Sequence, residues 1–344
     1  MRAARLIDGD NRLHIETIPD PTLRPGSAIA RIGAAFVSAF SASLLERDAP
    51  LTPRRPSTPG QDAIGVIEAV SDEVSSLQAG MRVFCNPWYE PYHPTGNGPI
   101  AFLGHFAMSE AAMSLLEQWP NGAYAERIAL PASCFTPIPS SINLPDEVLC
   151  RLGWLGTAYG ALRRSSFRPG QTVAILGANG MVGSSAILSA LALGASKVFA
   201  IGRRAEALEP LANLDARVEI ILDPADIPEI HVVLVAASGD HNAVLETLLQ
   251  KVQRRGSIVA VSFADEPLRA SVMHLVISDI TLRGSIWFDQ GHLNEMLALI
   301  ASGVLRLNVC SADTFGLDDV NQAIDAAKGP RTNPFRHVAL KIGG

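Results

Sequence analysis

Short apolar runs recur through the second half of the chain, and amphipathic stretches separate several of them. These runs predict strands over residues 173–176, 198–201, 218–222, 232–236, 258–261 and 280–286. A helical spacing of apolar residues lies between two of the runs, over 243–252. Strands that are apolar throughout are typical of parallel sheets buried on both faces. We therefore predict β-α-β units in a doubly wound α/β domain.

The first 150 residues carry a different pattern, with short β-type runs and many prolines and glycines. Strands are predicted over 13–16, 27–32 and 63–70, with turns at 24–26 and 78–80. This pattern predicts a β-rich, barrel-like first domain. Near the end of the chain, the spacing predicts helices over 292–301 and 317–328 and a last strand over 337–342.

The segment from Cys85 to about 118 breaks the strand pattern. Its prolines and glycines predict a long loop, which a helix over 107–117 follows. Long irregular segments in compact domains are usually functional loops or insertions. The aromatic residues Trp88, Tyr89 and Tyr92 could cover a substrate or mediate a subunit contact. A packed insertion without a further role is the alternative.

Three glycines spaced three apart follow the predicted strand over 173–176. Such glycines allow a tight turn, close approach of the backbone to a phosphate, and close helix–strand packing. The N–H groups of the following helix then face the anion. The candidate cofactor-binding residues of this loop are Gly177, Asn179, Gly180, Met181, Val182 and Gly183. Taken alone, the same glycines would also suit a plain tight turn.

The end of the next predicted strand indicates which dinucleotide is bound. NAD sites usually place an acidic residue there to bind the ribose 2′-hydroxyl, about 20 residues past the glycines. Here the position is Gly202, followed by Arg203 and Arg204. Guanidinium groups would bind a 2′-phosphate and favour NADPH by on the order of 10- to 10⁴-fold. A solvated basic turn is the alternative.

Length, charge and cysteines narrow the class of protein. A chain of 344 residues is long enough for two domains, and its net charge of −6 argues against a nucleic-acid partner. No leader-like region is seen at the start, and no apolar run approaches the roughly 18 residues of a membrane span. The four cysteines are widely separated, which disfavours a structural zinc site and fits a reducing cytoplasm.

Read in order, these features resemble the medium-chain dehydrogenase/reductase superfamily. The motifs that carry the resemblance, besides the glycine loop, lie at 58–70, 80–83, 122–126, 156–162 and 169–170. The resemblance covers nearly the whole chain. It implies a GroES-like catalytic domain over 1–150, completed by 290–344, and a Rossmann NADPH-binding domain over 151–289. It also implies a homodimer through the strand at 280–286.

The chain departs from the zinc-containing alcohol dehydrogenases of this superfamily. These carry a cysteine where this chain has Ser38 and Gly-His-Glu where it has Gly60-Gln61-Asp62, and their third ligand position falls near Gly153. Neutral serine, glutamine and glycine cannot supply the thiolate and imidazole ligands that hold zinc. We therefore expect no metal.

Further cofactor contacts are implied by the resemblance. Their candidates are Thr157, Ala236, Ala237, Ser262, Ser285, Trp287 and Arg336. Two of them have simple structural alternatives. Thr157 could instead be a helix N-cap. Arg336 could form a surface salt bridge rather than approach the pyrophosphate.

Without zinc, reduction needs an acceptor that is activated by conjugation, or a polar group where charge develops. We therefore predict a zinc-independent, NADPH-dependent oxidoreductase acting on a quinone or an α,β-unsaturated carbonyl, with an apolar substrate. The candidate catalytic residues are Ser38, Gln61 and Asp62. Asp62 could donate a proton if burial raised its pKa, or it could accept backbone N–H groups. A carbonyl or imine reductase, an alcohol dehydrogenase, and a non-catalytic NADPH sensor are the alternatives.

Overall fold

The computed structural model describes residues 1–45, 51–94, 96–262, 267, 269–329 and 332–343, and these form two compact units. The catalytic unit comprises Met1–Leu152 and two C-terminal segments that begin at Cys310 and Arg336. The nucleotide unit comprises Gly153–Val309 and a short segment that ends at Phe335.

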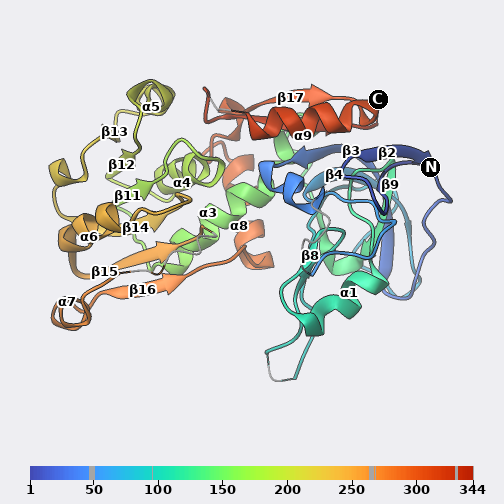
Figure 1. The fold of residues 1–344 in the computed structure, drawn as a ribbon, viewed down its shortest axis with the longest axis horizontal. Helices are drawn as coiled ribbons and strands as arrows, with labels where there is room; N and C mark the ends of the chain where they lie inside the picture. The colour runs from blue at the N-terminus through green and yellow to red at the C-terminus, as the bar shows by residue number, and fades with distance from the viewer. Residues whose placement is uncertain (46–50, 95, 263–266, 268, 330–331, 344) are drawn as a thin grey trace. The chain divides into compact units, whose positions relative to one another are not determined.

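The nucleotide unit is built on a six-stranded parallel sheet (Figure 1). Its order is β13 (Val218–Ile221), β12 (Lys197–Ile201), β11 (Thr172–Leu176), β14 (Ile230–Val235), β15 (Val252–Ala260) and β16 (Thr281–Gly284). Its helices include α3 (Leu152–Arg164), α4 (Met181–Ala192), α5 (Ala205–Ala212), α6 (Asn242–Lys251) and α7 (Val272–Ser278). The order reverses between β11 and β14, as in a Rossmann fold. The predicted doubly wound sheet is thus confirmed.

Helix α8 (Gln290–Ala301) also lies in the nucleotide unit, whereas the sequence assigned residues from 290 onward to the catalytic domain. It buries Leu293, Met296, Leu297 and Ile300. The hydroxyl of Tyr159, on α3, donates a hydrogen bond of 2.8 Å to Glu295 of α8. These contacts hold α8 on the nucleotide unit, so the chain returns to the catalytic unit only at Cys310.

The catalytic unit contains a larger mixed sheet and a two-stranded one. The larger sheet runs β10 (Phe135–Pro137), β5 (Arg82–Cys85), β4 (Ala63–Val70), β3 (Ser27–Val37), β18 (Arg336–Lys341) and β17 (Ser311–Phe315), and β9 (Arg127–Pro131) also pairs with β3. The smaller sheet pairs β1 (Arg2–Leu6) with β2 (Leu13–Thr17). Strand β18 pairs with β3, which ties the end of the chain to its beginning. Helices α2 (Asp146–Leu149) and α9 (Val320–Lys328) complete this unit.

The segment after Cys85 is more ordered than the long loop that the sequence predicts. It contains a three-stranded sheet of β6 (Trp88–Tyr89), β7 (Ala101–Phe102) and β8 (Phe106–Ala107). The predicted helix begins only at Met113 (α1, Met113–Gln118), because Ala107 pairs with Ala101 in the sheet. Aromatic packing explains the sheet: the Phe102 ring lies 5.1 Å from Trp88 and 4.8 Å from Phe106 between centroids.

Within the described ranges, no helix combines the length and apolar character needed to cross a membrane.

Candidate functional site

The glycine loop has the geometry of a phosphate-binding turn. Gly177 follows β11 with a φ of +83°, and a Cβ there would lie 2.7 Å from the amide nitrogen of Ala237. A Cβ on Gly183 would lie 2.2 Å from the carbonyl oxygen of Gly177. Only glycine therefore fits at either position. Helix α4 begins directly after the loop at Met181, so its N-terminal N–H groups are placed to bind an anion.

Strand β12 carries the two arginines to the same end of the sheet. The amide groups of Gly177 and Ala178 each donate a 3.1 Å hydrogen bond to the carbonyl of Ile201, the last residue of β12. Arg203 and Arg204 follow on the exposed surface. Among the described residues, neither guanidinium forms a hydrogen bond or an ion pair. Both are therefore available to an anion such as a 2′-phosphate, and the residues present fit NADPH.

Three further predicted cofactor positions lie at the same edge of the sheet. The amide of Ala236 donates a 2.9 Å hydrogen bond to the carbonyl of Leu176, which places the end of β14 beside the glycine loop. Ala237 is the residue that a Cβ on Gly177 would contact. Ser262 lies just after β15. The amide of Val261, the residue before Ser262, donates a 3.0 Å hydrogen bond to the carbonyl of Val235 at the end of β14. Ligands collect at such carboxyl ends in open α/β sheets.

The remaining cofactor candidates have structural partners. Thr157 lies inside α3 and donates to the carbonyl of Gly153 at 3.0 Å, so the N-cap alternative is wrong. Ser285 accepts a 3.0 Å hydrogen bond from Arg164. Trp287 is buried, with its ring stacked on Phe288. Arg336 forms an ion pair with Asp313, which is the salt-bridge alternative. Contacts of these residues with a cofactor stay predictions.

Ser38 and Gln61 meet because β3 and β4 are paired antiparallel. The amide of Phe36 donates to the carbonyl of Asp62 at 2.8 Å, which sets the end of one strand opposite the start of the other. The hydroxyl of Ser38 donates a 3.0 Å hydrogen bond to Oε1 of Gln61. The Ser38 oxygen also accepts the backbone N–H of Ser41 at 3.1 Å. Both Ser38 and Gln61 are buried.

Sequence reasoning missed two members of this network, Ser41 and Tyr124. The Ser41 hydroxyl lies 3.2 Å from that of Ser38 and 3.0 Å from that of Tyr124, which donates to the carbonyl of Phe36 at 3.1 Å. Gly60 allows this packing, because a Cβ there would lie 2.5 Å from the amide nitrogen of Ala123. A tyrosine between two alanines was the available signal, since a buried tyrosine hydroxyl needs a partner.

Asp62 is the most unusual group of the site. Its side chain is 1% exposed, and neither carboxyl oxygen has a hydrogen-bond partner. Among the described residues, no backbone N–H of another residue donates to this carboxyl group. Burial raises the pKa of Asp62 well above its usual value, which favours the protonated form of the carboxyl group. Its role in catalysis stays a prediction.

The residues present do not fit a catalytic zinc. The Ser38 hydroxyl is engaged by Gln61, and Gly153 has no side chain to offer. Within the described part of the chain, no group of three or more His, Cys, Asp or Glu residues is placed to bind a metal ion. The four cysteines are buried and free, and burial raises the pKa of each thiol.

The three aromatic residues proposed to contact the substrate differ in exposure. Trp88 packs edge-on against Phe102, and Trp88 and Tyr89 are half-buried. Tyr92 is 93% exposed. Contacts between these residues and a substrate stay a prediction.

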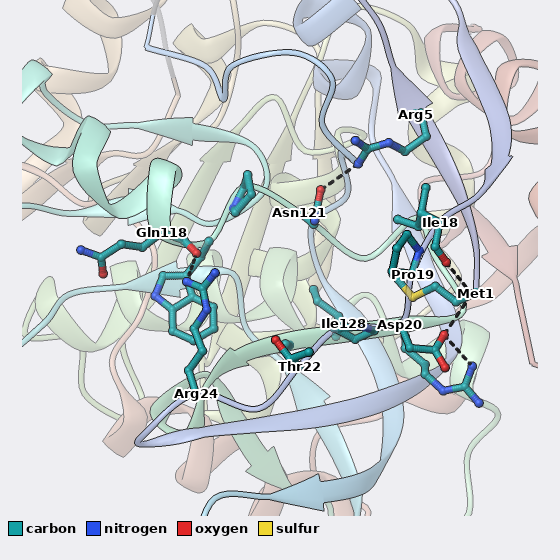
Figure 2. Close-up of a pocket in the computed structure, with 15 residues that line it drawn as sticks. Met1, Arg5, Ile18, Pro19, Asp20, Thr22, Arg24, Gln118, Asn121 and Ile128 are labelled. Atoms are coloured by element: carbon teal, nitrogen blue, oxygen red, sulfur yellow. Dashed lines mark hydrogen bonds and ion pairs between the residues drawn. The ribbon is translucent and has the colours of Figure 1, made fainter.

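A cavity of about 380 Å³ lies elsewhere on the catalytic unit, and Figure 2 shows its lining. It contains none of the predicted site residues. Several polar groups of the lining contact one another: the N-terminal amino group of Met1 lies 2.9 Å from Asp20, and Arg5 donates to the neutral side chain of Asn121 at 3.0 Å. Arg24 lies over the Trp119 ring at 5.0 Å.

Comparisons with known proteins cover both units. The alcohol dehydrogenase GroES-like domain model matches residues 25–140, and the zinc-binding dehydrogenase model matches residues 182–302. The chain is 27% identical to an alcohol dehydrogenase of Geobacillus stearothermophilus over 99% of each chain. It is 26% identical to a (R,R)-butanediol dehydrogenase of Neisseria gonorrhoeae over 92% of this chain and 93% of that one. The solved alcohol dehydrogenase of Thermus sp. ATN1 matches all of both chains, with a TM-score of 0.79 and 25% identity.

Proposed function

We propose that this chain is a zinc-independent, NADPH-dependent oxidoreductase of the medium-chain dehydrogenase/reductase superfamily, a family that the two domain models and the relatives support. Its proposed acceptor is a quinone or an α,β-unsaturated carbonyl. The observation that carries the proposal is the hydrogen bond from Ser38 to Gln61. Two neutral side chains satisfy one another where zinc-containing members of the superfamily hold their metal. A conjugated acceptor suits such a site, because it needs less activation than a simple ketone.

The proposed cofactor is supported by the nucleotide unit. The glycine loop and the start of α4 would hold the pyrophosphate, and Arg203 and Arg204 would bind the 2′-phosphate. When bound, NADPH supplies the hydride for reduction. The chain's own contribution there is to bind and orient the cofactor.

Gln61 and Asp62 supply the polar groups of the proposed reaction. With its oxygen bonded to Ser38, Gln61 keeps its Nε2 group free of hydrogen bonds to described residues. That N–H group would donate to the acceptor oxygen, where negative charge develops. Burial raises the pKa of Asp62, the next residue along the chain, and so favours its protonated form. The Ser38–Ser41–Tyr124 network keeps the Gln61 amide in one orientation.

We also propose that the protein acts as a cytoplasmic homodimer. All four residues of β16 are exposed, and the strand lies at the edge of its sheet with α7 near it (Figure 1). Val272, Met273, Val276 and Ile277 make α7 apolar on its surface. A second copy would pair with the open edge and cover this face. Light scattering of wild type and Ile277→Asp tests this: a dimer that becomes monomeric supports it, and a monomeric wild type overturns it.

The main test combines metal analysis with NADPH oxidation. We expect metal-free protein to oxidise NADPH with a quinone or enone, with no change after treatment with a chelator. About one zinc per chain that is lost together with activity would overturn the zinc-independent proposal. Saturable NADPH binding without turnover on quinones, enones, aldehydes and cyclic imines would instead indicate a sensor.

The names of the relatives favour a second candidate, an NADPH-dependent alcohol dehydrogenase or carbonyl reductase. Oxidation of a secondary alcohol with NADP⁺ separates the two. A rate with alcohols and simple ketones that exceeds the rate with conjugated acceptors would favour this candidate.

A further inference from the structure

A second buried polar side chain in the catalytic unit has no partner. His105 is completely buried, and neither ring nitrogen has a hydrogen bond in the described structure. Burial lowers its pKa to about 3, so the ring is neutral at physiological pH. A neutral imidazole has one N–H donor and one acceptor, and burying both unpaired is unfavourable.

The backbone around His105 holds the ring in this position. The residue lies in the turn between β7 and β8, and its amide donates to the carbonyl of Phe102 at 2.9 Å. The preceding residue, Gly104, has a φ of +71°, and a Cβ on it would lie 2.2 Å from the amide nitrogen of Gly122. The turn therefore packs directly on neighbouring backbone. An apolar side chain at this position would avoid the energetic cost of the two unpaired ring nitrogens.

Aromatic rings surround the imidazole, and one of them reaches the surface. The Phe40 ring stacks on His105 with centroids 5.3 Å apart and planes 25° apart. Phe106 packs against both rings, at 5.6 Å from Phe40 and 5.4 Å from His105. Phe40 is 42% exposed, which is unusual for a phenylalanine. The Phe40 ring is thus partly exposed and stacks on the buried imidazole, whose nitrogens have no hydrogen bonds.

Phe40 is also close in sequence to the proposed reacting site. It lies in the short 3-10 helix Ala39–Leu45, two residues after Ser38 and next to Ser41, which bonds to both Ser38 and Tyr124. An acceptor that contacts this site and extends along the helix would meet the Phe40 ring first. A flat ring stacks well on phenylalanine, whereas an aliphatic chain does not.

We propose that Phe40 and His105 bind the ring of an aromatic acceptor, with Phe40 moving aside so that His105 hydrogen-bonds a polar substituent on that ring. This rests on the proposed function and names its substrate class as aromatic conjugated carbonyls that carry a hydroxyl or carbonyl group. The bound substituent would satisfy the imidazole. The free protein would instead keep it unpaired at a cost in stability, as is common for functional residues.

Equilibrium dialysis with three enones tests the proposal directly. The probes are benzalacetone, its para-hydroxyphenyl analogue and an aliphatic enone of similar size. We expect wild type to bind the hydroxyphenyl probe about tenfold more tightly than benzalacetone, as one added hydrogen bond would give. The aliphatic enone should bind most weakly. His105→Leu should remove the advantage of the hydroxyl group and leave benzalacetone affinity nearly unchanged.

Two controls separate this role from a purely structural one. His105→Leu should raise Tm, because it removes unpaired polar atoms, whereas loss of a structural imidazole would lower it. His14→Leu makes the same exchange at an exposed histidine of the same unit and should leave the probe ratio unchanged. Phe40→Ala should expose His105 to diethyl pyrocarbonate, located by peptide mapping, and the hydroxyphenyl probe should protect it.

The outcomes distinguish this inference from the proposed function. An unchanged probe ratio in His105→Leu, or no binding of any aromatic probe to wild type, would overturn the inference. If the enones were reduced with NADPH in that case, the proposed function would stand alone. If the probe ratio depended on His105 but NADPH were not oxidised, the ring site would stand and the proposed function would fail.

Discussion

The glycine loop of the nucleotide unit and the Ser38–Gln61 network of the catalytic unit are built in contrasting ways. In the loop, backbone N–H groups are the binding groups, and glycine is needed because there is no room for a side chain. A Cβ on Gly183 would lie 2.2 Å from a carbonyl oxygen. In the network, side chains from four separate positions satisfy one another. The loop leaves two charged arginines free at the surface, whereas the catalytic unit buries an unpaired carboxyl group. Binding a common cofactor thus uses exposed charge and main chain, and the proposed chemistry uses buried polar groups.

The largest effect on NADPH binding should come from placing a side chain in the glycine loop. Gly183→Val would force a Cβ into the carbonyl of Gly177, so we expect NADPH binding to weaken by more than about 100-fold. Fluorescence titration measures the affinity, and far-UV circular dichroism verifies the fold. Gly316→Ala is the matched control, because its Cβ would come no closer than 3.7 Å to another residue. Unchanged affinity in a folded Gly183→Val variant would show that the loop does not bind the cofactor.

Removing the free arginines should have the next largest effect. We expect Arg203→Ala together with Arg204→Ala to raise the NADPH KM by at least about tenfold, since each charged hydrogen bond contributes roughly 1.5–3 kcal/mol. The NADH KM should be nearly unchanged. Arg168→Ala, at another exposed arginine of this unit, serves as the control. Equal losses for both cofactors would rule out a role in binding the 2′-phosphate.

The buried carboxyl group should appear in the pH dependence of stability. Because burial raises the pKa of Asp62 in the folded state, the folded protein binds this proton more tightly than the unfolded chain does. Stability should therefore fall as pH rises above about 4, by up to about 1.4 kcal/mol per pH unit until the folded pKa is passed. Tyr124 and Cys150, the titratable groups near it, have raised pKa values and stay neutral over this range.

Urea unfolding of Asp62→Asn between pH 5 and pH 8 measures this contribution. The variant should lack the fall in stability, so that its advantage over wild type grows with pH. Asp226→Asn, at an exposed carboxyl group, should parallel wild type. Parallel curves for Asp62→Asn and wild type would mean that Asp62 is ionised in the folded protein.

The smallest effect concerns the outer end of the network. Tyr124→Phe removes the hydroxyl group that bonds Ser41 and the carbonyl of Phe36. We expect a loss of about 1–2 kcal/mol in the free energy of unfolding. NADPH affinity should stay at its wild-type value. A change in NADPH affinity of tenfold or more would contradict the expectation that the Ser38–Gln61 network does not contribute to cofactor binding.

Local patterns predicted most of the elements. The predicted strand over 63–70 coincides with β4, and five of the six strands of the nucleotide sheet lie within two residues of their predicted bounds at both ends. Strand β15 begins before the apolar run that predicted it. The pattern missed the first half of the strand, because that half carries exposed polar side chains such as Arg254 and Arg255. The segment after Cys85 was mispredicted, since its short strands depend on aromatic contacts between residues far apart in sequence.

The sequence by itself determined the features that depend on neighbouring residues: the parallel strands, the glycine turn, the arginines after β12, and the neutral residues at 38 and 61. Only the tertiary structure decided which side chains meet. The bond between Ser38 and Gln61 follows from the pairing of β3 with β4, and Tyr124 joins because Gly60 admits its backbone. The unpaired state of Asp62 and His105 also became visible only there. Burial and partners are properties of packing between distant segments, and residue type alone does not specify them.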